Sequence, residues 1–201
     1  MEKRVKEKGE PGYKELKAEL RGGQAHSLYV LYGEESFLID KLVESLVELL
    51  IEPGSQALDK VMINAGGQPA KLDADRLLAE VMTPPFLSRR KLVIVKNCGW
   101  FSPSAGARKA ESGAPESEED DDDESVQPAS AGKGRQDILA GLFARIPDSC
   151  CLVFIESKVD KRLKHLIGLI RKKGVLAEIG REQPQILQKW VFAECRRRQI
   201  E

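Results

Sequence analysis

The turn after the first apolar strand is where a phosphate-binding site would be expected in this sequence. The run over residues 28–32 ends at Gly33 and an amphipathic helix follows, so the helix N-terminus would offer backbone N–H groups to an anion. A P-loop, GxxxxGK[ST], also needs a second glycine and a lysine–hydroxyl pair to wrap and neutralise phosphate. The turn instead reads GEESFLIDK, in which Glu34 and Glu35 would repel phosphate. GxGxxG is also absent, so we do not expect nucleotide binding here.

Acid–base and nucleophilic chemistry has few candidates. The apolar run over residues 150–156 ends in Glu156 and Ser157, a single carboxylate without an obvious partner for holding magnesium. Ser157, Asp160 and His165 are the residue types of a hydrolase triad. However, the GxSxG turn that exposes a nucleophile is absent, and this spacing imposes no triad geometry. We therefore predict no active site and no cofactor.

The four cysteines do not form a metal-binding pattern. No CxxC motif occurs, and the chain has only two histidines. Cys150 and Cys151 are neighbours in an apolar strand pattern, where successive side chains point to opposite faces. They cannot line one site together, so we predict buried or inactive thiols and no metal site.

Strand and helix patterns alternate along the chain. Apolar runs typical of buried strands cover residues 28–32, 60–64, 91–95, 150–156 and 175–179. Amphipathic helical patterns cover 34–50, 73–82, 136–146 and 160–174, and a short helix begins at Tyr13. Continuous apolar strands between such helices predict an α/β domain, with a parallel sheet covered by helices on both faces.

Composition divides the chain further. Its 32 basic and 32 acidic residues balance, but residues 103–135 hold nine acids and four bases, so the remainder is modestly basic. The segment 102–135 is rich in Ser, Gly, Pro and acids and nearly without apolar residues, which predicts a disordered insert that is a solvated spacer or a competitor for basic patches. We expect an extension with a short helix over 1–27, an α/β domain over 28–180 and the start of a helical second domain over 181–201.

The chain has neither a secretory signal pattern nor an apolar run close to the ~20 residues of a membrane span. We therefore expect a cytoplasmic protein.

The stretch MTPPFLSRRKLVIVKN, residues 82–97, joins a predicted helix to a predicted strand. Two prolines stiffen it, and Phe86 and Leu87 then stand side by side on a connector, where backbone usually meets water. The two side chains either pack beneath their own sheet or contact another protein. The residues by themselves leave both explanations open.

Four stretches, taken together and in order, resemble the delta subunit of bacterial DNA polymerase III. They are LYVLYGEESFLIDKLVESL, MTPPFLSRRKLVIVKN, CCLVFIESKVDKRLKHLIGLIRKKGVLAEI and QILQKWVFAECRRRQI, the last of which looks like the start of that family's small helical second domain. The resemblance covers about residues 13–201 apart from the acidic insert. It implies an AAA+-like (P-loop NTPase-like) parallel sheet without a functional P-loop, in a non-catalytic subunit of a DNA-directed DNA polymerase holoenzyme, itself a nucleotidyltransferase.

The resemblance also implies a role in DNA replication. Subunits of this family bind and open the sliding clamp (beta subunit) with a hydrophobic wedge from the connector before the third strand, without hydrolysing ATP themselves. The implied partners are the clamp, the other clamp-loader subunits through a C-terminal domain that this sequence lacks, and DNA within the complex. The matching wedge residues are Met82, Pro85, Phe86 and Leu87, with Arg89 and Arg90 as candidate supporting cations.

Three other functions compete with this interpretation. An AAA-type ATPase would require the nucleotide-binding turn that is missing. A structural subunit of the delta-prime type usually brings zinc-type cysteine clusters and an arginine finger in a serine-arginine-cysteine context, neither of which is visible here. Direct DNA binding would use the Lys and Arg residues within 161–173 and 196–198.

Overall fold

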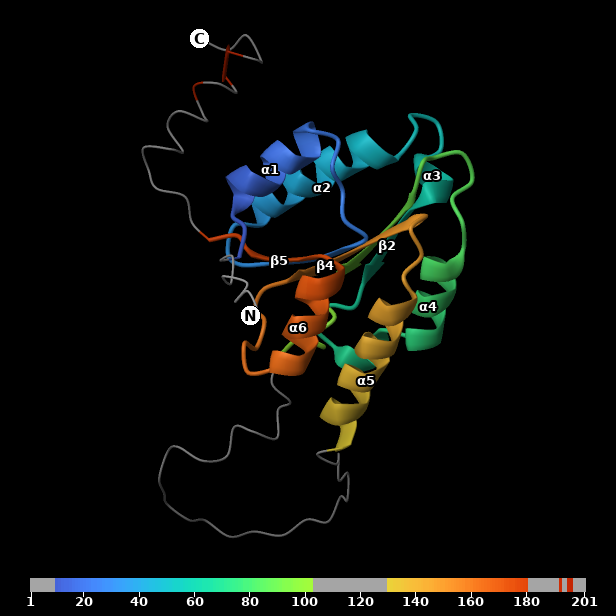
Figure 1. The fold of residues 1–201 in the computed structure, drawn as a ribbon, viewed down its shortest axis with the longest axis vertical. Coiled ribbons are helices and arrows are strands. Elements are labelled where there is room, and N and C mark those ends of the chain that lie inside the picture. The colour runs from blue at the N-terminus through green and yellow to red at the C-terminus, as the bar shows by residue number, and fades with distance from the viewer. Residues whose placement is uncertain (1–9, 103–129, 181–191, 193–194, 197–201) are drawn as a thin grey trace, which may run out of the picture.

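Five parallel strands form one sheet in the order β2-β3-β4-β1-β5. The computed structural model describes residues 10–102, 130–180, 192 and 195–196 (Figure 1). The strands are β1 (Leu28–Tyr32), β2 (Lys60–Asn64), β3 (Lys91–Lys96), β4 (Cys150–Glu156) and β5 (Val175–Glu178). The helices are α1 (Tyr13–Arg21), α2 (Ser36–Leu50), α3 (Gln56–Asp59), the 3-10 helix η1 (Pro69–Lys71), α4 (Ala74–Met82), α5 (Ser130–Arg145) and α6 (Lys164–Lys173). The strands agree with the predicted ranges to within one residue.

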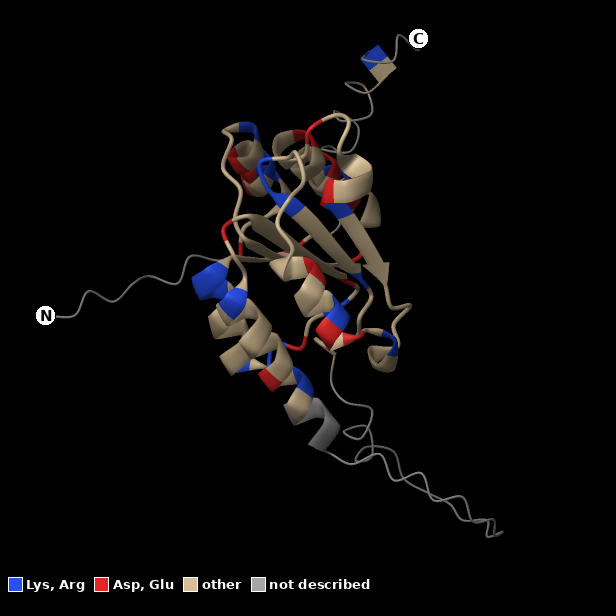
Figure 2. Ribbon diagram, turned by 90° about the vertical axis from the view of Figure 1, so that its right-hand side faces the viewer, with Lys and Arg blue, Asp and Glu red and all other residues tan. Residues whose placement is uncertain are grey.

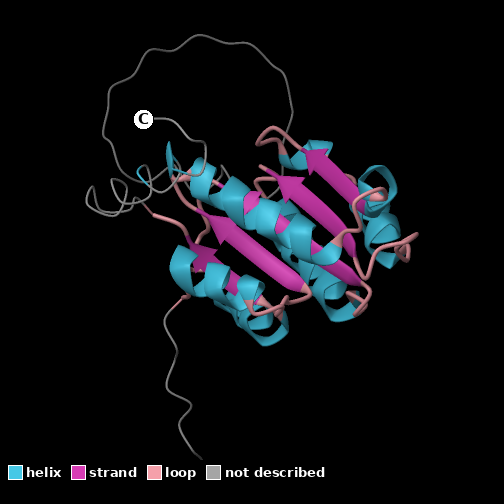
Figure 3. Ribbon diagram, turned by 90° about the horizontal axis from the view of Figure 1, so that it is seen from above, coloured by secondary structure: helices cyan, strands magenta, loops and turns pink. Residues whose placement is uncertain are grey.

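Helices cover both faces of the sheet, which confirms the predicted fold class. Helices α1 and α2 lie on one face and α4, α5 and α6 on the other, as seen in Figures 1 and 3. Successive strand residues enter opposite cores: Cys150 belongs to the core under α4–α6 and Cys151 to the core under α1 and α2. Both cysteines are fully buried, which is why the strands read as continuous apolar runs rather than as alternating ones.

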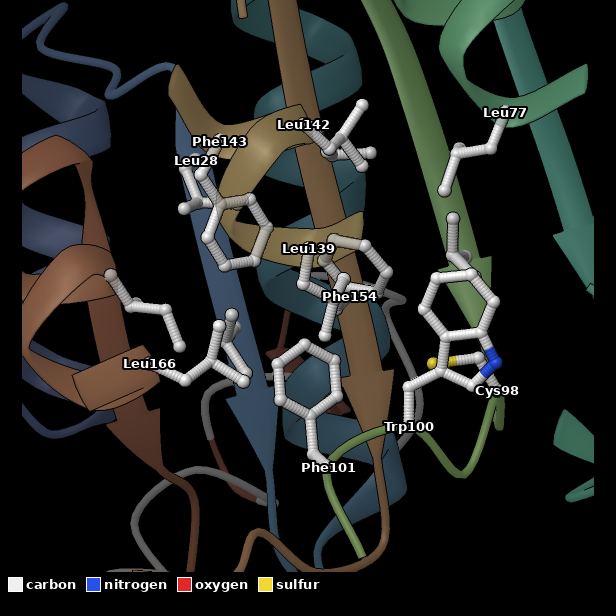
Figure 4. Packing of buried hydrophobic residues seen from close by; sticks show 14 of the residues in the cluster. Leu28, Leu77, Cys98, Trp100, Phe101, Leu139, Leu142, Phe143, Phe154 and Leu166 are labelled. Carbon is white, nitrogen blue, oxygen red and sulfur yellow. The ribbon is translucent and has the colours of Figure 1, made fainter. Parts of the chain in front are cut away.

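Aromatic rings fill the core between the sheet and helices α5 and α6. Figure 4 shows Phe154 of β4 between Phe143 of α5 and Phe101, which follows β3. The ring centroids of Phe101 and Phe154 are 5.1 Å apart and those of Phe143 and Phe154 are 6.0 Å apart, both with edge-to-face geometry. Such pairs contribute roughly 0.5–1.5 kcal/mol beyond the area they bury. They anchor the segment that leaves β3 to the body of the domain.

The structure corrects two predicted boundaries. Helix α5 begins at Ser130, so the predicted disordered insert does not extend to residue 135. The apolar pattern of this helix starts only near Ile138. Once that part is packed, extending the helix through the polar residues before it costs little free energy, because only nucleation of a helix is unfavourable. The second boundary is residue 27, since Leu16 and Leu20 of α1 are buried with α2 in the same core. Helix α1 is therefore part of the domain rather than an extension.

Two predictions fall on residues outside the described part. The first concerns the acidic insert, most of which, residues 103–129, lies outside the described residues. Most of the predicted second domain over 181–201 is also outside, where Phe192, Cys195 and Arg196 alone are described and are helical. Within the described residues, no helix combines the length and the apolar character that crossing a membrane requires.

Gly33 is required by the fold. Its φ is +135°, and a Cβ atom there would lie 2.2 Å from the backbone oxygen of Ile179, just past the end of β5. The same carbonyl oxygen accepts a hydrogen bond from the backbone N–H of Glu35 (3.4 Å). The glycine that suggested a phosphate-binding turn therefore admits a close approach of the protein's own backbone.

We expect Gly33→Ala to lower the free energy of unfolding by about 2 kcal/mol or more, because the new methyl group collides with backbone and the φ value is strained. Urea denaturation followed by circular dichroism measures the change. Gly168→Ala is the control, because nothing lies within 4 Å of its added Cβ and alanine favours a helix. A Gly33→Ala protein as stable as the unmodified chain would contradict this account.

Candidate protein-interaction site on the connector before β3

The connector of residues 83–90 presents apolar side chains to solvent. It leaves α4, passes α3 at the upper right of Figure 1 and enters β3 at the N-terminal edge of the sheet. Phe86 is 68% exposed, Leu87 66% and Met82, at the end of α4, 52%. Pro85 is half-buried beside them. The structure thus excludes the explanation that Phe86 and Leu87 pack beneath their own sheet.

A buried carboxylate holds the backbone of this connector. Asp59, the last residue of α3, is 1% exposed. One carboxylate oxygen accepts the backbone N–H of Phe86, and the other accepts those of Leu87 (3.0 Å) and Ser88 (2.8 Å). Three successive N–H groups directed at one anion form an arrangement that binds phosphate or carboxylate ligands in other proteins. Here the anion belongs to the chain itself, 27 residues before Phe86.

Two buried serines reinforce the same attachment. The hydroxyl oxygens of Ser55 and Ser88 lie 2.5 Å apart, and the Ser88 oxygen also accepts the backbone N–H of Glu52 (3.0 Å). Ser55 donates to the Glu52 carbonyl (3.2 Å). Segment 52–59 therefore contacts the connector through a carboxylate and a hydroxyl pair. Buried polar groups in such a closed network are satisfied, so the network fixes the loop in one conformation.

The two ends of the connector are joined as well. Lys91, the first residue of β3, is 4% exposed, and its amino group lies 2.7 Å from the Glu80 carboxylate on α4. Arg90 donates to the backbone oxygens of Asp148 (2.6 Å) and Ala25 (3.0 Å) and to the Ser27 hydroxyl (2.7 Å).

The two candidate supporting cations therefore differ. Arg90 is engaged within its own domain, whereas the side chain of Arg89 is exposed. Arg89 is the one of the pair that faces solvent beside the apolar residues.

The hydrogen bonds determine the charge of Asp59. Burial by itself raises the pKa of this carboxyl group, but the hydrogen bonds donated by the backbone N–H groups of Phe86, Leu87 and Ser88 outweigh burial and lower the pKa well below its usual value. Asp59 is therefore ionised at neutral pH.

The cavity at the opposite edge of the sheet is not lined by basic residues within the described part of the chain. A cavity of about 420 Å³ lies there, at the carboxyl ends of β2, β3 and β4, where ligands bind in many α/β proteins. Its lining contains the carboxylate of Glu156 but neither lysine nor arginine. Glu156 accepts the backbone N–H groups of Cys98 (2.7 Å) and Gly99 (3.3 Å), and burial raises its pKa. This carboxylate stabilises the loop after β3.

The other catalytic candidates remain separate groups. The Asp160 carboxylate accepts hydrogen bonds from the Arg162 guanidinium (3.0 Å), and no hydrogen bond to His165 or Ser157 occurs in the described part of the chain. Nor does this part contain a cluster of three or more His, Cys, Asp or Glu residues that could hold a metal ion.

Several cations considered for DNA binding pair with acids of the same domain. Lys161 lies 2.8 Å from the Glu178 carboxylate, and Arg171 lies 3.4 Å from Glu10. Basic and acidic residues are mixed on the face shown in Figure 2. Of the second group considered, only Arg196 is among the described residues.

Sequence reasoning located the exposed pair but not the residues that hold it. Asp59, Ser55 and Ser88 carry no motif, and α3 is four residues long, too short for a helical period. The one available signal was a carboxylate immediately before a strand, a weak indication at best.

Comparison with solved structures defines the class of the fold. The chain is similar to a clamp-loader delta protein of Bacillus subtilis, with a TM-score of 0.62 and 20% identity over 89% of this chain and 45% of that chain. It is also similar to a DNA polymerase III gamma subunit-related protein of Thermotoga maritima, with a TM-score of 0.50 and 13% identity over 87% of this chain and 48% of the other. The parallel five-stranded sheet with its helices is thus similar to the AAA+-like folds of these two proteins.

The sequence comparisons show similarity to one family. Residues 29–114 match the family model described as DNA polymerase III, delta subunit. DNA polymerase III subunit delta of Bacillus subtilis (strain 168) is 30% identical over 78 residues, which are 39% of this chain and 21% of that protein. Both matches are to the DNA polymerase III delta subunit family, which confirms the predicted resemblance. The chain spans less than half the length of these relatives.

The lowered pKa of Asp59 makes stability depend on pH. Because the folded pKa lies below the unfolded value of about 4, the carboxylate stabilises the fold above that pH, and the contribution is lost as the pH falls below it. We expect the difference in unfolding free energy between the unmodified chain and Asp59→Asn to be constant from pH 7 to 5 and to shrink towards pH 2. Urea denaturation across this range measures the difference, with Asp148→Asn as a charge control at an exposed site. A difference that does not vary with pH would argue against the ionised carboxylate.

Proposed function

We propose that this chain acts in DNA replication as a delta-type clamp-loader subunit and binds the sliding clamp through the connector before β3. Phe86 and Leu87 form the wedge, and Met82 and Pro85 form its border. The observation that carries the proposal is two adjacent large apolar side chains, both about two-thirds exposed, on a backbone that is held at three successive N–H groups. Exposed apolar pairs on fixed loops are characteristic of protein contacts.

Burial of the two wedge side chains would contribute a substantial part of the binding free energy. Burying a leucine or phenylalanine side chain contributes roughly 1.5–3 kcal/mol. A connector that already has its bound conformation loses little conformational entropy on docking, so most of this free energy contributes to affinity. Arg89 is exposed next to the wedge and is available to an acidic rim on the clamp, whereas Arg90 is bound to Asp148, Ala25 and Ser27.

Opening of the clamp follows from a difference in affinity. A wedge that fits the clamp surface better in the open ring than in the closed ring shifts the ring towards the open state, and only by that difference. The chain needs no bond-making chemistry for this step. The turn at Gly33, closed by the backbone of Ile179, and the cavity without cations support a subunit that does not hydrolyse ATP itself.

The wedge and the usual nucleotide position lie at opposite edges of the sheet. Segments 22–27, 52–59 and 83–90 all precede strands, whereas Gly33 and Glu156 are at strand ends. A clamp bound at the N-terminal edge leaves the other edge free for neighbouring loader subunits. Such an assembly would act in the cytoplasm and would bring DNA near the chain. Lys161, which precedes α6, and Arg171 of α6 pair with acidic residues of the same domain, which argues against DNA contact through these two cations.

The double substitution Phe86→Ala, Leu87→Ala should weaken binding to the cognate sliding clamp by about 100-fold or more, since two buried apolar side chains are lost. Surface plasmon resonance with immobilised clamp measures the dissociation constant. The matched control is Phe37→Ala, Ile138→Ala, which removes two other partly exposed apolar side chains, on α2 and α5. Equal affinity of the double variant and the unmodified chain would refute the wedge.

A further inference from the structure

An exposed apolar loop binds a partner well only if something keeps it in the bound conformation. The connector between α4 and β3 has neither helical nor strand structure over residues 83–90. Fixing the backbone of one residue costs about 1–2 kcal/mol, so a loop that becomes ordered only on docking loses much of the free energy gained by burying its side chains. The source of the loop's order is therefore part of the binding site.

Asp59 is that source at the centre of the loop. The backbone N–H groups of Phe86, Leu87 and Ser88 all donate to its carboxylate, so these three residues present their N–H side to α3. The Phe86 and Leu87 side chains are left facing solvent, while Ser88 is buried against segment 52–59.

The attachment is also separate from the other supports of the loop. The Glu80–Lys91 ion pair joins its two ends, and Arg90 fixes its last residue to the loops before β1 and β4. Neither of these contacts reaches the backbone of Phe86 or Leu87. Removing the Asp59 carboxylate would therefore release the tip and leave both ends of the loop in place.

We propose that Asp59 is a positioning residue of the clamp-binding site: it holds Phe86 and Leu87 in the conformation that enters the clamp, and the Ser55–Ser88 hydroxyl pair secures that conformation. This inference rests on the proposed function. Asp59 itself is 1% exposed, so its role would be exerted through the connector rather than by contact with the clamp. Asp59 acts on affinity through the fraction of molecules in which the loop already has the binding conformation. The apparent dissociation constant is the intrinsic one divided by that fraction.

The test compares Asp59→Asn with the unmodified chain in two measurements. The carboxamide keeps the shape of the side chain but turns an NH₂ group towards N–H donors, so one side of the attachment is lost. We expect NMR amide hydrogen exchange at Phe86, Leu87 and Ser88 to accelerate at least tenfold, with core strand amides unchanged. Clamp affinity, by surface plasmon resonance, should fall about tenfold, as for a loop that is competent in a tenth of the molecules.

The control is Asp148→Asn, which changes the net charge equally at the same sheet edge but leaves the connector intact. It should bind the clamp within a factor of two of the unmodified chain. If Asp59→Asn does not fold by circular dichroism, Ser55→Ala and Ser88→Ala replace it, because each removes one hydroxyl and leaves the carboxylate in place. Each of these should lower affinity two- to threefold.

The outcomes separate this inference from the proposed function. Loss of affinity in both Phe86→Ala, Leu87→Ala and Asp59→Asn supports both. If the wedge variant loses affinity but Asp59→Asn keeps full affinity, the positioning role is overturned and the wedge stands. If Asp59→Asn is unfolded, full affinity in both serine variants has the same meaning. Unchanged amide exchange in a folded Asp59→Asn protein also overturns it. Full affinity in the wedge variant overturns the proposed function and this inference with it.

Discussion

The geometry of the candidate interaction site depends on one buried carboxylate. Asp59 accepts hydrogen bonds from three successive backbone N–H groups of the connector and in this way ties α3 to a loop that is distant in sequence. A buried anion is stable only when donors satisfy it, and buried N–H groups are stable only when acceptors satisfy them. Each group supplies what the other needs. The apolar side chains of Phe86 and Leu87 are consequently the part of the loop that is exposed to solvent.

The two edges of the sheet differ in the contacts that their backbone groups make. At the carboxyl ends of the strands, the carbonyl of Ile179 approaches Gly33 closely, and Glu156 accepts the N–H groups of the loop after β3. Backbone N–H groups at this edge, which bind nucleotide phosphates in related folds, thus partly donate to acceptors of the protein itself. At the N-terminal edge, the backbone donors of the connector are satisfied internally and its apolar side chains are exposed. This division of roles agrees with the proposed binding of a protein at the N-terminal edge.

Sequence patterns were sufficient for most of the fold. The five strands and the parallel α/β arrangement follow from the alternation of continuous apolar runs with amphipathic helices, since burial on both faces requires apolar residues at every strand position. Patterns were insufficient where structure comes from contacts between distant residues. The polar start of α5 at Ser130 and the packing of α1 against α2 are examples, because neither polar composition nor a single short helix reveals what lies next to it.

The sequence by itself determined the strands, the missing phosphate loop and the position of the apolar pair, because each is written in residues that are neighbours along the chain. Only the tertiary structure decided that Phe86 and Leu87 face solvent, that Arg90 is engaged by its own domain and that Asp59 holds the connector. The physical reason is the range of the interactions. Periodicity reports burial on one element, whereas a hydrogen bond between residues 59 and 87 exists only after β2 and β3 have paired side by side.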